Sequence, residues 1–290
     1  MRLSACLLIA LQATFSVRTE MVVLPVTVTD SRGQSVTGLT ADRFRVYDEG
    51  RLQPIALFRG GDFSVTVGLI VDHSQSMRSK LPAVNAAIAA FARSGREDDE
   101  LFVVGFNDRA ELRTLPGGKL FTNDASELAA ALDAGPAAGM TALYDAVALG
   151  LRHLPAGRSD RKALIVVTDG GDNASRLKYS QVRDLARGSH AVVYGIGLTG
   201  AQLQEENPGN LKRLCLDSGG AAHFPSVTAD VEAAMIEIAR DLRAQYTIGF
   251  TPAAPRSGRE FHSVKVTVVS PPGAKFRVRT RTGYTLRPPQ

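Results

Sequence analysis

Three short polar segments of this 290-residue chain carry residue types that could hold a metal ion. Their carboxylate and hydroxyl oxygens are the ligands that a hard cation such as Mg²⁺ prefers, with Mn²⁺ and Ca²⁺ as alternatives. The segments are residues 72–76, 139–143 and 168–173. The candidate metal ligands in them are Asp72, Ser74, Ser76, Thr141 and Asp169.

The first segment, Asp-His-Ser-Gln-Ser, places its three oxygen-bearing residues at alternate positions. In an extended turn, alternate side chains point the same way, so Asp72, Ser74 and Ser76 can face one ion. Two carboxylates only balance the charge of a divalent ion, and an open coordination position would then attract a carboxylate from outside. The pattern favours binding of an acidic group over catalysis. In the competing interpretation, Asp72 and Asp169 are caps and turn formers whose neighbours satisfy backbone groups.

The elements that must position these segments alternate along residues 63–243. Continuous apolar runs are typical of parallel strands buried on both faces, and they occupy residues 65–71, 101–106, 163–167 and 191–196. Helical spacing of apolar residues is seen near 81–91, 124–134, 141–154, 179–188 and 228–243. This alternation predicts an α/β domain with a doubly wound, mostly parallel sheet. In such a sheet, ligands bind at the carboxyl ends of the strands, where the three polar segments stand.

Both flanks of that domain, residues 18–62 and 244–290, show short strand-like patterns bounded by turn residues. Each flank offers only about three strands, which is too few for a stable sheet. We therefore expect the two flanks to pair into one small β-sandwich.

Taken together, the three segments resemble the metal-ion-dependent adhesion site (MIDAS) of von Willebrand factor type A domains. The matching pattern is Asp72-x-Ser74-x-Ser76 with Thr141 and Asp169. Over about residues 18–290 the chain is similar to the VWFA-related domain family of acidobacterial proteins, on segments such as PVTVTDSRGQSVTGLTADRFRVYDEG, TALYDAV, TDGGDN and RAQYTIGF. The resemblance implies a Rossmann-like A domain with a bound divalent ion. It also implies that Ser74, Ser76 and Thr141 contact the ion directly or through water, and that the aspartates often act through water.

The function implied is non-catalytic, adhesion-type capture of an aspartate or glutamate of a protein partner through the ion. One alternative is a scaffold or assembly subunit of a cell-envelope complex, in which the ion only rigidifies the loops. A metal-dependent hydrolase is disfavoured, because no paired base or nucleophile stands beside the candidate ligands in the sequence. We predict no enzyme activity, no nucleic-acid partner and no stable membrane span. The oligomeric state stays open.

Four residues near the candidate site carry separate expectations. His73 is expected to be a solvated loop residue. Gln75 stands where the family usually has glycine, and it would be strained if φ is positive there. Asp145 and Asp172 either orient the site or, as the default, lie on the surface.

The net charge of +5 comes from the C-terminal segment, because residues 256–290 contain eight Lys or Arg and one Glu. Arg277, Arg279 and Arg281 alternate with Val278 and Thr280, which indicates one solvated face of a strand; a polyanion or a membrane surface is the competing partner.

The uncharged run that follows Arg2 suits a signal peptide over residues 1–17, and a mis-set start codon is the alternative explanation. We therefore expect a secreted or periplasmic protein. Two cysteines, Cys6 and Cys215, exclude a disulfide framework and a four-thiolate zinc site.

Overall fold

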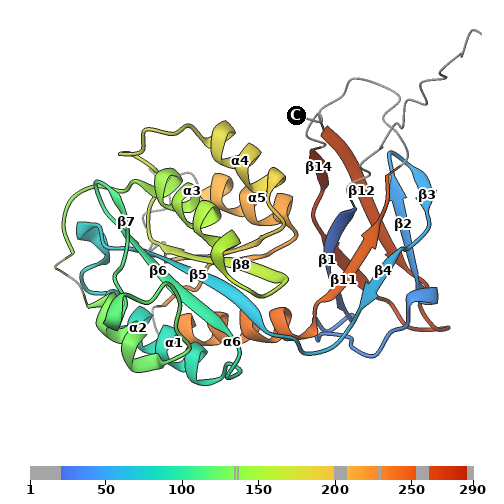
Figure 1. Cartoon of the computed structure of the whole chain (residues 1–290), viewed down its shortest axis with the longest axis horizontal. Helices are drawn as coiled ribbons and strands as arrows, with labels where there is room; N and C mark the ends of the chain where they lie inside the picture. Colours follow the sequence, from blue (N-terminus) through green and yellow to red (C-terminus); the bar gives the residue numbers. More distant parts are fainter. Residues whose placement is uncertain are drawn as a thin grey trace, which may run out of the picture.

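The computed structural model of the protein describes residues 21–133, 135, 137–198, 208–227, 230–252 and 261–285. These residues form a central sheet covered by helices and, beside it, two smaller antiparallel sheets (Figure 1). The α/β class and the additional β-unit expected from the sequence are both confirmed. The segment interpreted as a signal peptide, residues 1–17, lies outside the described residues.

The central sheet has six strands in the order β10-β9-β8-β5-β6-β7, with β7 antiparallel to its neighbour and the other pairs parallel. Every residue of β5, β6 and β9 is buried, which explains why their sequences are continuously apolar instead of alternating. The strands are β5 (Val65–Asp72), β6 (Glu100–Phe106), β7 (Ala110–Leu112), β8 (Arg161–Thr168), β9 (Val192–Gly197) and β10 (Ala222–His223).

Helices cover both faces of this sheet (Figure 1). One face carries α1 (Leu81–Arg93), α2 (Ala125–Leu132) and α6 (Val231–Ala244); the other carries α3 (Leu143–His153), α4 (Tyr179–Gly188) and α5 (Pro208–Ser218). Short 3-10 turns are η1 (Ala41–Arg43), η2 (Gln75–Met77), η3 (Pro116–Gly118) and η4 (Leu154–Ala156). Of the six helices in the described residues, five match predicted stretches, whereas α5 was not predicted. No helix in the described part of the chain is long and apolar enough to cross a membrane.

The two flanks of the chain share two four-stranded sheets, as expected. Their orders are β13-β1-β11-β4 and β14-β12-β2-β3. Strand β1 pairs on both sides with strands from the other end of the chain, and β2 pairs with β12, so neither flank completes a sheet alone. The strands are β1 (Val22–Thr29), β2 (Phe44–Asp48), β3 (Arg51–Gln53), β4 (Leu57–Arg59), β11 (Tyr246–Phe250), β12 (Phe261–Val268), β13 (Arg277–Thr280) and β14 (Gly283–Thr285).

An aromatic cluster from both flanks fills the centre of this sandwich. The ring of Tyr246 lies 5.0 Å from that of Phe44 and 5.8 Å from that of Phe58, and the three rings are tilted against one another. The Tyr246 hydroxyl donates to the carbonyl of Val36 at 2.9 Å and accepts from the N–H of Leu39 at 3.0 Å. Both the apolar ring and the polar tip of Tyr246 therefore hold the N-terminal flank to the C-terminal one.

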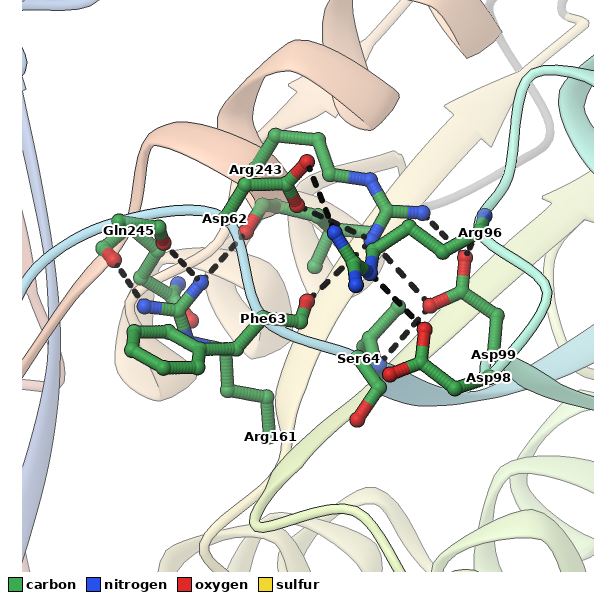
Figure 2. Close-up of polar contacts among 12 residues, drawn as sticks. Asp62, Phe63, Ser64, Arg96, Asp98, Asp99, Arg161, Arg243 and Gln245 are labelled. Atoms are coloured by element: carbon green, nitrogen blue, oxygen red, sulfur yellow. Dashed lines mark hydrogen bonds and ion pairs between the residues drawn. The ribbon is translucent and has the colours of Figure 1, made fainter.

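A buried arginine joins the sandwich to the central domain. Arg161, the first residue of β8, donates to the carbonyl oxygens of Gly61 at 3.0 Å, Leu242 at 3.4 Å and Gln245 at 2.5 Å. Its guanidinium lies 5.0 Å from the ring centre of Phe63 (Figure 2). Burial lowers the pKa of Arg161 to about 10. This one side chain thus contacts both chain segments that connect the two units.

A second connection corrects the interpretation of the basic C-terminal strand. Arg277 is exposed, but Arg279 pairs with Asp241 of α6, and Arg281 is only 4% exposed. Arg281 donates to the carbonyl of Ser189 at 3.1 Å, just past the C-terminus of α4. The expectation of one solvated basic face was therefore wrong for Arg279 and Arg281. The alternation of basic and uncharged residues predicted a strand, but it could not predict which helices would cover the arginines.

Candidate metal centre

The five predicted ligands meet at the carboxyl edge of the central sheet. After β5 the chain continues to β6 on one side, while β8 lies on the other side, so the loops that follow β5 and β8 diverge and leave a crevice. A cavity of about 870 Å³ occupies that position, and its lining includes Ser74, Ser76, Thr141 and Asp169. Asp72 is fully buried beneath it, at the end of β5.

The oxygens of this cavity have the spacing that a small cation needs. Ser74 Oγ lies 3.2 Å from Ser76 Oγ, and Ser76 Oγ donates to Asp169 Oδ1 at 2.8 Å. Neighbouring ligands of an octahedral Mg²⁺, each about 2.1 Å from the ion, lie about 3 Å apart. The donor set and its spacing therefore fit a divalent ion held by Ser74, Ser76 and Asp169, with Thr141 on the facing loop.

Asp72 lies beneath the serine hydroxyls and supports the turn that carries them. Its Oδ1 accepts from the backbone N–H of Ser74 at 2.7 Å, and its Oδ2 accepts from the Thr168 hydroxyl at 2.6 Å. Burial raises the pKa of Asp72 despite these hydrogen bonds. Asp72 holds the turn in shape, and because it is fully buried beneath the cavity, contact with an ion through water suits it better than direct ligation.

Few charged ligands are available at this edge. In the part of the chain that the structure describes, no group of three or more His, Cys, Asp or Glu side chains is placed to hold a metal. An ion bound here would depend on neutral hydroxyls for much of its coordination. It would keep much of its positive charge for an incoming ligand.

The loops around Thr141 and Asp169 are tied together by aspartate and asparagine side chains. Thr141 N–H donates to Asn173 Oδ1 at 2.7 Å, and Tyr144 N–H donates to Asp172 Oδ1 at 3.1 Å. Asp145 accepts from the N–H groups of two residues in the loop after β8, both at 3.0 Å. Both aspartates are half-buried and hold the loops beside the candidate site together, which supports the orienting role over a purely surface position. Sequence reasoning also missed Thr168 and Asn173.

Gly139 permits the close approach of the loop that carries Thr141. Its φ is +81°, and a Cβ atom there would lie 2.1 Å from Asp108 Oδ2. The same aspartate accepts from the backbone N–H of Met140 at 3.0 Å. A side chain at position 139 would push this hydrogen-bonded loop away from the cavity.

Two expectations about the first segment were not met. The ring nitrogens of His73, which is 2% exposed, face the carbonyl oxygens of Val71 at 3.1 Å and Leu132 at 3.0 Å, so it is not a solvated residue. Gln75 begins the 3-10 turn η2, and Glu49 is the one non-glycine residue with positive φ among those described. The condition for strain at Gln75 is therefore absent.

Two exposed apolar side chains border the cavity. Met140 is 53% exposed on the loop before Thr141, and Phe224 is 38% exposed just after β10. The Phe224 ring lies over Gly197 at the end of β9, where a Cβ atom would approach it to 2.6 Å. The rim thus combines a polar centre with apolar borders, which is typical of a surface that contacts protein.

Comparison with known proteins agrees with this architecture. Residues 67–171 match the family model of the von Willebrand factor type A domain. The structure of a von Willebrand factor type A protein from Catenulispora acidiphila is similar over 93% of this chain and 76% of that chain, with 15% identity and a TM-score of 0.54. Proximal thread matrix protein 1 from the mussel byssus covers 68% of this chain and 51% of its own, with 16% identity and a TM-score of 0.52.

The D319A mutant of the PilB minor pilin from Streptococcus sanguinis covers 80% of each chain at 13% identity, with a TM-score of 0.51. Curated proteins gave no sequence match. At these identities the structural similarity concerns the fold, and the finer resemblance to the acidobacterial family stays a prediction. Residues 67–171 thus match the von Willebrand factor type A family model, and the sheet order and helix arrangement of the central unit are those of the same fold.

Proposed function

We propose that this protein is a non-catalytic binding module that captures an aspartate or glutamate of a protein partner through a divalent ion. The ion, Mg²⁺ or alternatively Mn²⁺ or Ca²⁺, would be held by Ser74, Ser76, Thr141 and Asp169, with Asp72 beneath them. The observation that carries the proposal is the oxygen spacing of 3.2 Å and 2.8 Å along Ser74, Ser76 and Asp169. When bound, the ion supplies a positive centre for an outside carboxylate.

The rim supports a protein as the source of that carboxylate. A free inorganic or small organic acid would leave Met140 and Phe224 in water, whereas an acidic residue on a protein brings neighbouring side chains that can cover them. Phe224 is held in place by its contact with Gly197, so it offers a fixed apolar surface. We propose that the partner presents its acidic residue next to an apolar one.

The hydrogen bonds of the two carboxylates argue against catalysis. Both oxygens of Asp72 accept donors from the protein, and both oxygens of Asp169 do so as well. A general base must reach the substrate proton, and Asp72 is fully buried beneath the cavity while Asp169 is paired with Lys80. These carboxylates instead stabilise their own loops.

The alternative function is that of a scaffold or assembly subunit. The observation that favours it is the rigid attachment of the sandwich to the central domain, which Arg161 and Arg281 provide through backbone contacts. In that role the ion would only stiffen the loops, and removal of the ion would leave partner binding intact. We propose a secreted or periplasmic location from the sequence of residues 1–17.

Calorimetric titration with Mg²⁺ and with Mn²⁺ tests the metal site. We expect one site in the wild-type protein and none in Asp169→Asn, because the amide loses the charge that faces the ion. Asp184→Asn is the matched control, since Asp184 is exposed on α4 away from the cavity. Equal binding by Asp169→Asn and the wild type would contradict the proposed site.

Affinity capture from the cell envelope of the source organism tests the partner. The wild-type protein is used with Mg²⁺, with a chelator, and as the Asp169→Asn variant. The proposal expects one protein that is retained only by the wild type with Mg²⁺ and is lost when its acidic residue at the contact is changed to the amide. Retention in all three conditions would support the scaffold alternative.

A further inference from the structure

A lysine lies inside the proposed metal site, at a position that the function does not explain. Lys80 immediately precedes α1, and its Nζ lies 2.5 Å from Asp169 Oδ2. The Asp169 side chain is 3% exposed and that of Lys80 is 24% exposed. The contact therefore joins two chain segments 89 residues apart within a nearly buried pocket.

Together with Ser76, this lysine provides a hydrogen-bond donor to each oxygen of the Asp169 carboxylate. Ser76 donates to Oδ1 and Lys80 to Oδ2. A divalent ion that reaches Asp169 meets an ammonium group already paired with it, and the two cations repel each other more strongly in a nearly buried site than in water. Metal binding through Oδ2 requires the ammonium to move away, and binding through Oδ1 is opposed by its charge.

We propose that Lys80 is a built-in competitor of the divalent ion, which holds Asp169 when the ion is absent and lowers the affinity of the site for metal. The inference rests on the proposed metal site. In the metal-free protein the ammonium compensates a carboxylate that would otherwise be buried and unpaired, so the loop edge is stable without metal. The same contact opposes the ion, because the lysine is displaced from Asp169 when the ion enters.

The position of Lys80 allows its ammonium group to move between Asp169 and solvent. Its backbone is fixed by hydrogen bonds from its own N–H to the carbonyl of Met77 at 2.8 Å and from Val84 N–H to its carbonyl at 3.1 Å. Only the flexible four-carbon stem has to move for the ammonium to reach solvent, and the side chain is already partly exposed. Displacement of the lysine therefore requires no change in α1.

Calorimetry with Mg²⁺ and Mn²⁺ on Lys80→Met tests the proposal. This variant keeps the apolar stem and removes the charge, so we expect it to bind the ion about tenfold more tightly than the wild type. Thermal unfolding without metal gives a second measurement, in which Lys80→Met is expected to melt below the wild type and to gain more from added Mg²⁺. Lys119→Met is the matched control, because it removes an ion pair with Glu127 (2.6 Å) outside the site.

Lys80→Gln guards against a folding defect, since it retains a hydrogen-bond donor without the charge, and it is expected to tighten binding in the same direction. Equal or weaker metal binding by both variants would overturn the role of Lys80 while leaving the metal site in place. If the wild type and both variants all fail to bind either ion, the metal site itself is wrong and the inference falls with it.

Discussion

The two edges of the central sheet carry opposite chemistry. At the carboxyl edge, hydroxyls and two carboxylates surround a cavity, and the hydrogen bonds run within or between neighbouring loops. At the amino edge, Arg161, Arg243 and Arg281 are wholly or largely buried, and each donates to a carbonyl of the sandwich or of its connections. There, Asp99 accepts from the N–H of Val65 and pairs with Arg243 (Figure 2).

The difference teaches how one sheet supports both a binding site and a rigid attachment. The carboxyl edge is accessible and has an exposed rim, whereas the amino edge is closed by cations that donate to helix C-termini, where the macrodipole favours positive charge. We therefore expect substitutions at the amino edge to change stability and those at the carboxyl edge to change binding. The following predictions test that separation.

The largest loss of stability is expected for Arg161→Met. The change leaves the carbonyls of Gly61, Leu242 and Gln245 without their donor, and we expect a loss of about 3 kcal/mol in the free energy of unfolding. Urea unfolding measures it. Arg59→Met is the control at the same junction, since its pair with Asp160 is exposed and is expected to contribute less than about 1 kcal/mol. A large change in metal affinity in Arg161→Met would show that the two edges are coupled.

Arg281→Met removes the second connection and is expected to lower the free energy of unfolding by about 2 kcal/mol, because two carbonyls near the end of α4 and that of Gly283 lose a donor. Its neighbour Arg277, which is exposed on β13, provides the matched control Arg277→Met. Similar stabilities for the two variants, measured by urea unfolding, would mean that Arg281 contributes no more than a surface residue.

Gly139→Ala tests the carboxyl edge. Beyond the cost of positive φ, about 1 kcal/mol, the new Cβ collides with Asp108, and we expect Thr141 to shift and metal affinity to fall about tenfold. Gly117→Ala isolates the cost of the backbone, because Gly117 has φ +72° and open space around it. Calorimetry and unfolding on both variants separate the two effects. Unchanged metal binding in Gly139→Ala would place the loop outside the site.

The smallest effect is a pH dependence at His223, the last residue of the short edge strand β10. Burial lowers the pKa of His223, although Glu237 and Asp241 raise it, and Arg279 lowers it further. Below pH 6.5 the unfolded chain takes up this proton before the folded one, so the stability present above pH 6.5 is lost as pH falls toward the lower folded pKa.

His223→Gln should therefore flatten the change in unfolding free energy between about pH 7.5 and about pH 5.5. Metal-free protein is used so that pH-dependent metal binding does not add to the slope. Burial raises the pKa of Asp72 and gives that carboxyl the opposite dependence, which the wild type and the variant share. If the change of unfolding free energy with pH is the same in His223→Gln as in the wild type, another group is responsible for the acid sensitivity.

The fold and the position of the site could be predicted because both follow from local patterns. Continuous apolar runs indicated buried parallel strands, and residues just after parallel strands share one edge by geometry, which placed Asp72 near Asp169. The hydroxyl spacing at Ser74 and Ser76 was likewise visible in five consecutive residues.

What failed depended on contacts between distant segments. Lys80 meets Asp169 across 89 residues, and nothing in the residues around Lys80 indicates that contact. Arg281 directly follows β13, and its partners are carbonyls at the end of α4. The burial of His73 similarly depends on the carbonyl of Leu132 at the end of α2. Alternation of polar and apolar residues predicts a strand. It does not predict which helix end will pack over that strand and bury its polar side chains.

The pairing of β4 with β11 also determines how the molecule would carry a mechanical load. The A domain is inserted between these two strands, which are hydrogen-bonded neighbours with Arg59 opposite Thr247. A pull on a partner held at the carboxyl edge would run back along β5 to the connection at residues 60–64, and along α6 to Gln245. Both paths enter the sandwich side by side in one sheet. Tension would therefore be shared by β4 and β11 at a single attachment point. It would not pull opposite ends of the sandwich apart.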